Sequence, residues 1–206
     1  MKKKILLWCI IVVFLLSVSV AAVSERMCDD ISSGIVRLHI VAASDDESDQ
    51  KIKLLVRDAI IECQKEIFSD GIKKTLNNEE KEKIKKTAED VLVEQGALYG
   101  ATVETGNFYF PTKRYENITL PAGNYEAVRV VLGAGNGQNW WCVMYPPLCF
   151  TQSAVGKADA ESLDILKESM GEFSYDIISE ESIKIVPAFK IVEIFQVVKE
   201  KIRNSL

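Results

Sequence analysis

The alternation of apolar and polar residues predicts a strand near the start of the folded region. Residues 35–42 alternate throughout. Leu38 and Ile40 fall on one face of such a strand. Arg37 and His39 fall on the other. A period of two is typical of a half-buried strand, so His39 is expected at the surface.

Two amphipathic helices are expected after this strand. Ser44 and Glu47 have the spacing of a capping box, and apolar residues then recur at helical spacing until Gly71. Asn77 opens the second helix, whose apolar stripe extends to Leu98. A run of Glu and Lys on its other side indicates a solvated helix face.

Strands are expected from residue 101 onward. Three segments are rich in residues that favour strands: 102–110, 124–132 and 139–145. The glycine-rich stretch 133–137 predicts a hairpin turn between the last two. The fold class is therefore α+β, with an N-terminal strand and two helices packed on a mostly antiparallel sheet.

The C-terminal part of the chain is expected to be helical. Residues 157–170 have weak helical character, and residues 189–203 carry a wide apolar stripe at helical spacing. Such a stripe is typical of a core helix, although it also suits docking to a partner or to a membrane. Residues 151–206 are thus expected to be a helical extension packed on a domain formed by residues 25–150.

The first 24 residues resemble a segment that directs export. Three lysines precede an uncharged apolar run, Ile5–Val23, and Ala22 is a candidate residue before a cleavage site. The run is also about 20 residues long, which a membrane anchor needs. Residues 1–24 are therefore a signal peptide or an anchor, and membrane contact is expected through them only. In both cases the rest of the chain is exported.

The charge of the chain argues against one class of partner. The net charge is −5, and removal of the N-terminal lysines makes the domain more acidic, which argues against nucleic acid as a partner.

Cys142 and Cys149 flank a proline turn and are the candidate disulfide pair in an oxidising compartment. The alternative is that the cysteines of the exported domain are buried thiols.

No complete catalytic or metal-binding set is evident. His39 is the one histidine, and neither a Gly-x-Ser-x-Gly nor a Ser-x-x-Lys motif occurs. The acidic residues that begin at Asp45 lack the spacing of a calcium loop, and no Cys-x-x-Cys is present. The sequence therefore predicts no catalytic residues, no metal and no cofactor.

Two adjacent tryptophans stand out in the last predicted strand. Trp140 and Trp141 must point to opposite faces of the sheet, because side chains alternate along a strand. Large aromatic residues mostly fill cores, but they are also enriched where proteins dock. Either role remains open for each tryptophan.

Several motifs together resemble one protein family. Residues 139–143, Asn-Trp-Trp-Cys-Val, and residues 146–150, Pro-Pro-Leu-Cys-Phe, are similar to the stage II sporulation protein R family. The similarity extends to Phe-Pro-Thr-Lys-x-Tyr-x-Asn at 110–117 and Pro-Ala-Gly-x-Tyr-Glu-Ala at 121–127. It also includes Arg-Leu-His-Ile-x-Ala-x-Ser-Asp at 37–45.

The resemblance implies a signalling function in spore formation. Members of this family are exported from the forespore into the space between two membranes. There they activate a membrane-embedded aspartic protease of the mother cell, which processes the sigma factor E precursor. The chain would then be a ligand of this receptor protease and not an enzyme. The candidate contact residues are Arg37, His39, Ser44, Asp45, Trp140 and Trp141.

Two other functions compete with this one. An exported hydrolase acting on cell-wall or peptide substrates would need His39 as its base. A structural envelope protein would keep Ile5–Val23 as an uncleaved anchor.

Overall fold

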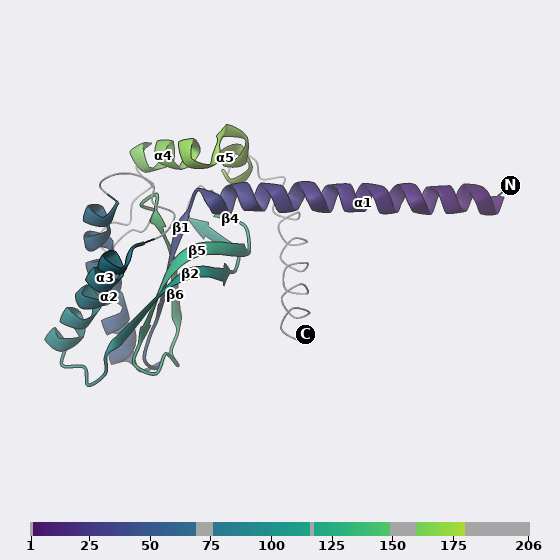
Figure 1. The fold of residues 1–206 in the computed structure, drawn as a ribbon. Coiled ribbons are helices and arrows are strands. Elements are labelled where there is room, and N and C mark those ends of the chain that lie inside the picture. Colours follow the sequence, from purple (N-terminus) through teal and green to yellow (C-terminus); the bar gives the residue numbers. More distant parts are fainter. Residues whose placement is uncertain (1, 69–75, 116–117, 149–159, 180–206) are drawn as a thin grey trace.

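The computed structural model describes residues 2–68, 76–115, 118–148 and 160–179. Its helices are α1 (Lys2–Ser33), α2 (Glu47–Ile67), α3 (Asn78–Glu94), α4 (Ala160–Met170) and α5 (Glu172–Ile178). Its strands are β1 (Val36–Val41), β2 (Ala101–Phe110), β3 (Lys113–Tyr115), β4 (Ile118–Leu120), β5 (Gly123–Leu132) and β6 (Asn139–Tyr145). Figure 1 shows α2 and α3 on one side of the main sheet and α1 extending away from it.

The main sheet has four strands in the order β2-β5-β1-β6. The β2–β5 and β1–β6 pairs are antiparallel, and β1 runs parallel to β5. Strands β3 and β4 form a separate antiparallel pair. The prediction of an α+β fold with a mostly antiparallel sheet is confirmed.

The hairpin predicted at residues 133–137 is wrong, because β1 lies between β5 and β6. The linker instead crosses the carboxyl end of β1. The amide of Asn136 donates to the carbonyl of Ala43 at 3.1 Å, and that of Gly137 donates to Ala42 at 3.0 Å. Glycines suit this crossing as well as a hairpin turn, so local sequence does not distinguish the two.

Helix α2 begins with a different set of contacts from those predicted. Asp46 is the N-cap and makes no capping bond through its side chain, so the predicted Ser44–Glu47 capping box is wrong. The Ser44 hydroxyl instead accepts a hydrogen bond of 3.1 Å from the Asp46 amide. The helix ends at Ile67, and Gly71 lies outside the described residues.

Helix α3 begins where the sequence predicts. The Asn77 side chain accepts a hydrogen bond from the Glu80 amide, and the Glu80 carboxylate accepts one from the Asn77 amide, both at 2.8 Å. The helix ends at Glu94, so Leu98 does not belong to its apolar stripe and is fully exposed. The stripe is real as far as Leu92, which is buried.

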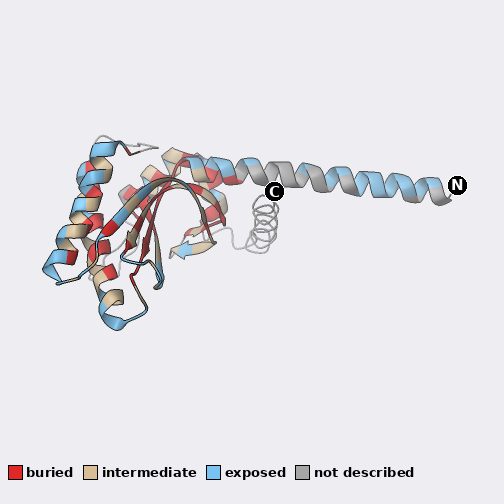
Figure 2. Ribbon diagram, turned by 60° about the horizontal axis from the view of Figure 1, so that its bottom comes forward, coloured by how far each residue is buried: buried red, intermediate tan, exposed pale blue. Residues whose placement is uncertain are grey.

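The two faces of the sheet bury separate apolar clusters. One cluster joins the sheet to α2 and α3 through residues such as Leu38, Val56 and Ile84. The other joins it to the end of α1, to β4 and to α4 and α5, and includes Ile31 and Leu166. Figure 2 shows this burial concentrated in the strands and in the helix faces turned toward them.

The C-terminal predictions are tested only in part. Helix α4 falls within the predicted weak helix at 157–170, of which residues 157–159 lie outside the described residues. The predicted helix at 189–203 lies outside them as well. Where the domain ends and the extension begins remains a prediction.

Candidate interaction site

Arg37 and His39 of β1 lie on the sheet face that turns away from α2 and α3. Trp141 of β6 is the register partner of His39 on the same face. The prediction that this face of β1 is exposed is wrong, because Arg37 is 0 % exposed and His39 is 7 % exposed. Aromatic side chains and the second apolar cluster cover Arg37, so β1 is buried on both faces.

The Arg37 guanidinium is held by neutral groups. Its Nε donates to the Cys142 carbonyl at 3.1 Å, and its Nη2 donates to the Tyr115 hydroxyl at 2.9 Å. Its Cζ lies 4.5 Å from the ring centre of Phe110 and 4.9 Å from that of Tyr125. Among the described residues, Nη1 has no hydrogen-bond partner. Within the described parts of the chain, this buried cation is thus stabilised by aromatic rings and dipoles and not by a carboxylate.

The His39 ring is fixed in one orientation. It stacks on Trp141 with ring centres 3.8 Å apart, and its Nε2 is hydrogen-bonded to the Asn139 side-chain oxygen at 2.6 Å. Burial lowers the pKa of His39, Arg129 lowers that pKa further, and the bond to Asn139 partly opposes both effects. The imidazole is therefore neutral at neutral pH.

The same row of the sheet contains two residues that the sequence analysis missed. Arg129 of β5 is the register partner of His39, and Glu104 of β2 is the partner of Arg129. Arg129 Nη1 lies 3.4 Å from the Glu104 carboxylate, and the side chains are 39 % and 48 % exposed. These residues come together only through the strand order, so no local motif could have identified them.

Trp140 lies on the other face of the sheet. It packs against the α2–α3 cluster, and the Cζ of Arg57 lies 4.5 Å from its ring centre. Arg57 is itself buried and lies 2.6 Å from the Asp58 carboxylate. The sheet therefore separates Trp140 from Trp141, and the two cannot form one contact surface.

Ser44 and Asp45 lie at the carboxyl end of β1. The Ser44 hydroxyl donates to Asp49 Oδ2 at 2.7 Å, and the Tyr99 hydroxyl donates to Asp49 Oδ1 at 2.6 Å. These two bonds hold the pKa of the Asp49 carboxyl below its usual value. Asp45 is exposed. Ser44 thus joins the end of β1 to α2, and Asp49 joins α2 to the loop before β2. This cluster is distinct from the Arg37 cage, by which we mean Arg37 with the rings of Phe110, Tyr115 and Tyr125.

The predicted disulfide is only partly visible. Cys142 is disulfide-bonded, and Cys149 lies outside the described residues, so their pairing remains a prediction. Cys9 and Cys63 carry thiols.

The groups at this site are ones that suit recognition of another molecule. His39 Nε2 is hydrogen-bonded to the side-chain oxygen of Asn139. No group of three or more potential metal ligands occurs in the described parts of the chain. The row offers a cation, a stacked indole and an amide, which are groups that bind another molecule.

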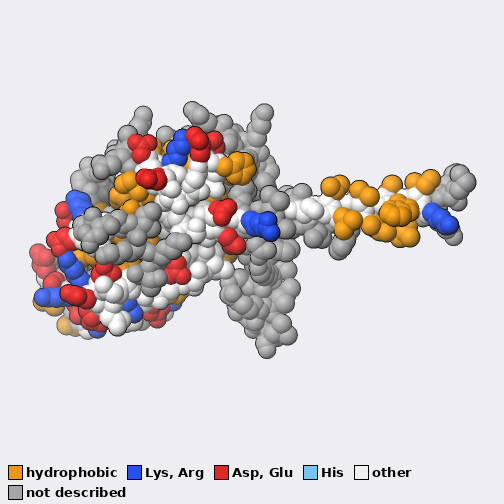
Figure 3. All heavy atoms as spheres, turned by 45° about the horizontal axis from the view of Figure 1, so that its top comes forward, with side chains coloured by type: hydrophobic (Ala, Val, Ile, Leu, Met, Phe, Trp, Pro, Cys, Tyr) orange, Lys and Arg blue, Asp and Glu red, His pale blue; other side chains and the backbone are white. Residues whose placement is uncertain are grey.

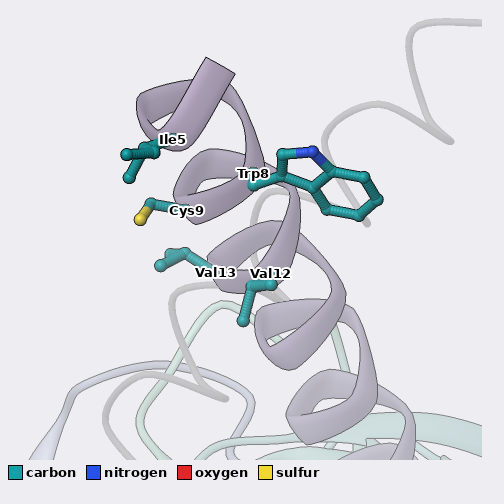
Figure 4. Close-up of a pocket in the computed structure, with 5 residues that line it drawn as sticks. All are labelled: Ile5, Trp8, Cys9, Val12 and Val13. Carbon is teal, nitrogen blue, oxygen red and sulfur yellow. The ribbon is translucent and has the colours of Figure 1, made fainter. Parts of the chain in front are cut away.

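Helix α1 presents a second surface of a different kind. Its first half is apolar and exposed, as Figure 3 shows for the part that extends from the body. Trp8 and Val12 lie beside Ile5, Cys9 and Val13 around a shallow apolar hollow on this helix (Figure 4). Judged on the described residues, none of the helices meets the length and hydropathy required to cross a bilayer.

Comparison with known proteins identifies the family. A sequence model of stage II sporulation protein R matches residues 32–155. The chain belongs to the stage II sporulation protein R family. It is also 34 % identical over 174 residues to stage II sporulation protein R of Bacillus subtilis (strain 168), an alignment that covers 79 % of this chain and 78 % of the relative. No solved structure shows significant similarity.

Membership in the stage II sporulation protein R family confirms the resemblance found in the motifs. The matched region contains the Arg37 cage, the Arg129–His39–Trp141 row and the cluster around Ser44. It begins at Ser32, after the apolar half of α1. The chain is therefore a sporulation protein.

Proposed function

We propose that the chain is an exported signal that activates a membrane-embedded aspartic protease of the mother cell. The activated protease then processes the sigma factor E precursor. Membership in the stage II sporulation protein R family, over a region that includes the whole candidate site, is the observation that carries this proposal. The name of the relative supports the role in sporulation. The proposed activation of the protease rests on the resemblance of the motifs to this family.

The proposed place of action is the space between the forespore and mother-cell membranes. The lysines and the apolar half of α1 direct the chain across the forespore membrane. Exposed apolar side chains such as Trp8 and Leu15 suit contact with lipid or with the export machinery. The folded domain then faces the receptor.

The proposed mechanism requires no chemistry from the chain itself. A ligand that binds the active arrangement of the receptor more tightly than the inactive one shifts the receptor population toward activity. The buried His39, bonded to Asn139, and the buried Arg37, enclosed by aromatic rings, hold the sheet beneath the partly exposed Arg129 and Trp141 in place.

Co-expression in a bacterium that does not sporulate tests the proposal. The receptor protease and the sigma factor E precursor are expressed with and without the full chain, and an immunoblot measures the cleaved fraction. We expect cleavage to increase when the chain is present. Equal cleavage with and without the chain would refute the proposed function.

A receptor variant in which the catalytic aspartates are replaced by asparagine is the control. It should give no cleavage even when the chain is present, because the chain only activates. Cleavage with this receptor variant would instead mean that the chain itself is a protease.

A further inference from the structure

The row formed by Glu104, Arg129, His39 and Trp141 runs across the four strands of the main sheet. We call it the Arg129 row. Its neighbours on the side of Arg37 are covered by the second apolar cluster. Glu104 and Arg129 are partly open to solvent, and Trp141 is half-buried. The row is therefore open to solvent at Glu104 and Arg129 and partly at Trp141, while His39 between Arg129 and Trp141 is buried.

The Arg129 row and the row beside it contain more positive than negative side chains. Arg37 lies in the adjacent row, fully buried, and no carboxylate among the described residues pairs with it. Arg129 has only the exposed Glu104 at 3.4 Å, and its buried Nε has no hydrogen-bond partner in the described structure. Two cations thus face one weakly held acid on a chain whose net charge is −5.

We propose that the Arg129 row binds a carboxylate on an acidic, extended segment of the receptor. This inference rests on the proposed function and names the contact surface for it. An arginine guanidinium suits a carboxylate, and the Arg129 side chain is 39 % exposed with only the Glu104 carboxylate, at 3.4 Å, as its charged partner among the described residues. Trp141, whose ring is fixed against His39, provides a flat apolar contact beside the charge.

In the free protein, the Glu104 carboxylate already contacts the Arg129 guanidinium that the receptor carboxylate would bind. Its contact with Arg129 is long and exposed, so it stabilises the sheet little and is readily displaced. The incoming carboxylate takes over Arg129 and also feels the field of the buried Arg37. Removal of the Glu104 charge should therefore strengthen binding.

The first test measures precursor cleavage in the co-expression assay with variants of the row. Arg129→Glu and Trp141→Ala should each reduce activation about tenfold or more, which corresponds to losing one well-formed contact. Glu104→Gln should match or exceed the wild-type chain. Lys86→Glu, an equal charge reversal on the exposed face of α3, is the matched control and should have no effect.

Folding of the variants is checked by thermal unfolding. Arg129→Gln is the second variant at this position, because Arg129→Glu places two acids side by side and can destabilise the sheet. A folded Arg129→Gln chain with wild-type activation would overturn the proposal. The proposal would also be overturned if Lys86→Glu reduced activation as much as Arg129→Glu does.

A second test does not depend on the receptor. The ¹⁵N-labelled full chain in detergent micelles is titrated with an acetylated peptide of alternating Thr and Glu, and then with its Thr and Gln analogue. The Arg129 Nε–H and Trp141 indole signals should shift with the Glu peptide alone. Equal shifts with both peptides, or none, would overturn carboxylate recognition. Glu-specific shifts without receptor activation would refute only the proposed function.

Discussion

Arg37 is the residue that departs most from its expected role. An arginine on the polar side of an alternating strand normally reaches solvent, yet here Tyr115, Phe110 and Tyr125 close over it. The rings compensate for part of the desolvation through their negatively charged faces. The guanidinium in turn bonds Tyr115 of β3 and Cys142 of β6, so it connects the small sheet to the main sheet.

The lowered pKa of His39 predicts how the stability of the protein depends on pH. Burial lowers its pKa below the ordinary value of 6.5, so the unfolded chain binds a proton before the folded one does. The free energy of unfolding should therefore fall as the pH drops from about 7 to about 5, and His39→Gln should lose this slope. Urea unfolding at several pH values measures it, and an unchanged slope in the variant would contradict the assignment.

Residue-level prediction from sequence succeeded in placing Arg37 and His39 on one face of β1, and Trp140 and Trp141 on opposite faces of β6. It failed on burial, since the covering side chains come from segments 70 or more positions away in the chain, such as Tyr115. It also missed Arg129, which reaches His39 only because β5 pairs with β1.

At the scale of elements, the linker between β5 and β6 decides the topology. It passes over the end of β1, and there the carbonyl of Ser44 lies directly against Gly137. A side chain at that glycine would collide with backbone that cannot move without shifting the start of α2. The close approach of these two backbones is what allows β1 to lie between β5 and β6.

Gly137→Ala should therefore destabilise the protein by about 3 kcal/mol, because an added methyl group has no space. Gly96→Ala is the matched control. Gly96 has a φ of +68° and nothing within 4 Å of its added Cβ, so only the backbone strain of about 1 kcal/mol applies. Equal losses in urea unfolding for the two variants would show that the crossing is not tight.

The helices and strands themselves were largely predictable from sequence. The apolar periodicities identify α2 and α3 because each of these helices buries one face against the sheet. Residues that favour strands identify β5. The order of the strands was not predictable, because the glycines of the linker fit a hairpin and a crossing equally well.

At the scale of the whole molecule, α1 is one continuous helix that connects the apolar segment to the domain. Its 32 residues span about 48 Å, and Cys28 and Ile31 in its last turns are buried. Figure 1 shows this end of α1 against the domain and the other end extending away from it. The apolar half therefore leaves the body without a flexible link.

Truncation separates the two halves of α1. Removal of residues 1–24 should leave the unfolding free energy of the domain nearly unchanged, because Cys28 and Ile31 are retained. Removal of residues 1–33 should cost about 3 kcal/mol, since the fully buried Ile31 and its turn are lost. Ile31→Ala in the shorter truncation is the matched variant and should account for most of that loss. Urea unfolding measures all three proteins, and equal stability of the two truncations would contradict this packing.

The most direct measurement compares the full chain with a chain lacking residues 1–24 in the co-expression assay. The truncated domain contains the whole candidate site but lacks the segment that we propose carries it across the membrane. We predict that the full chain raises cleavage of the sigma factor E precursor and that the truncated chain leaves it at background. Equal activation by both chains, or no activation by the full chain, would contradict an exported signal.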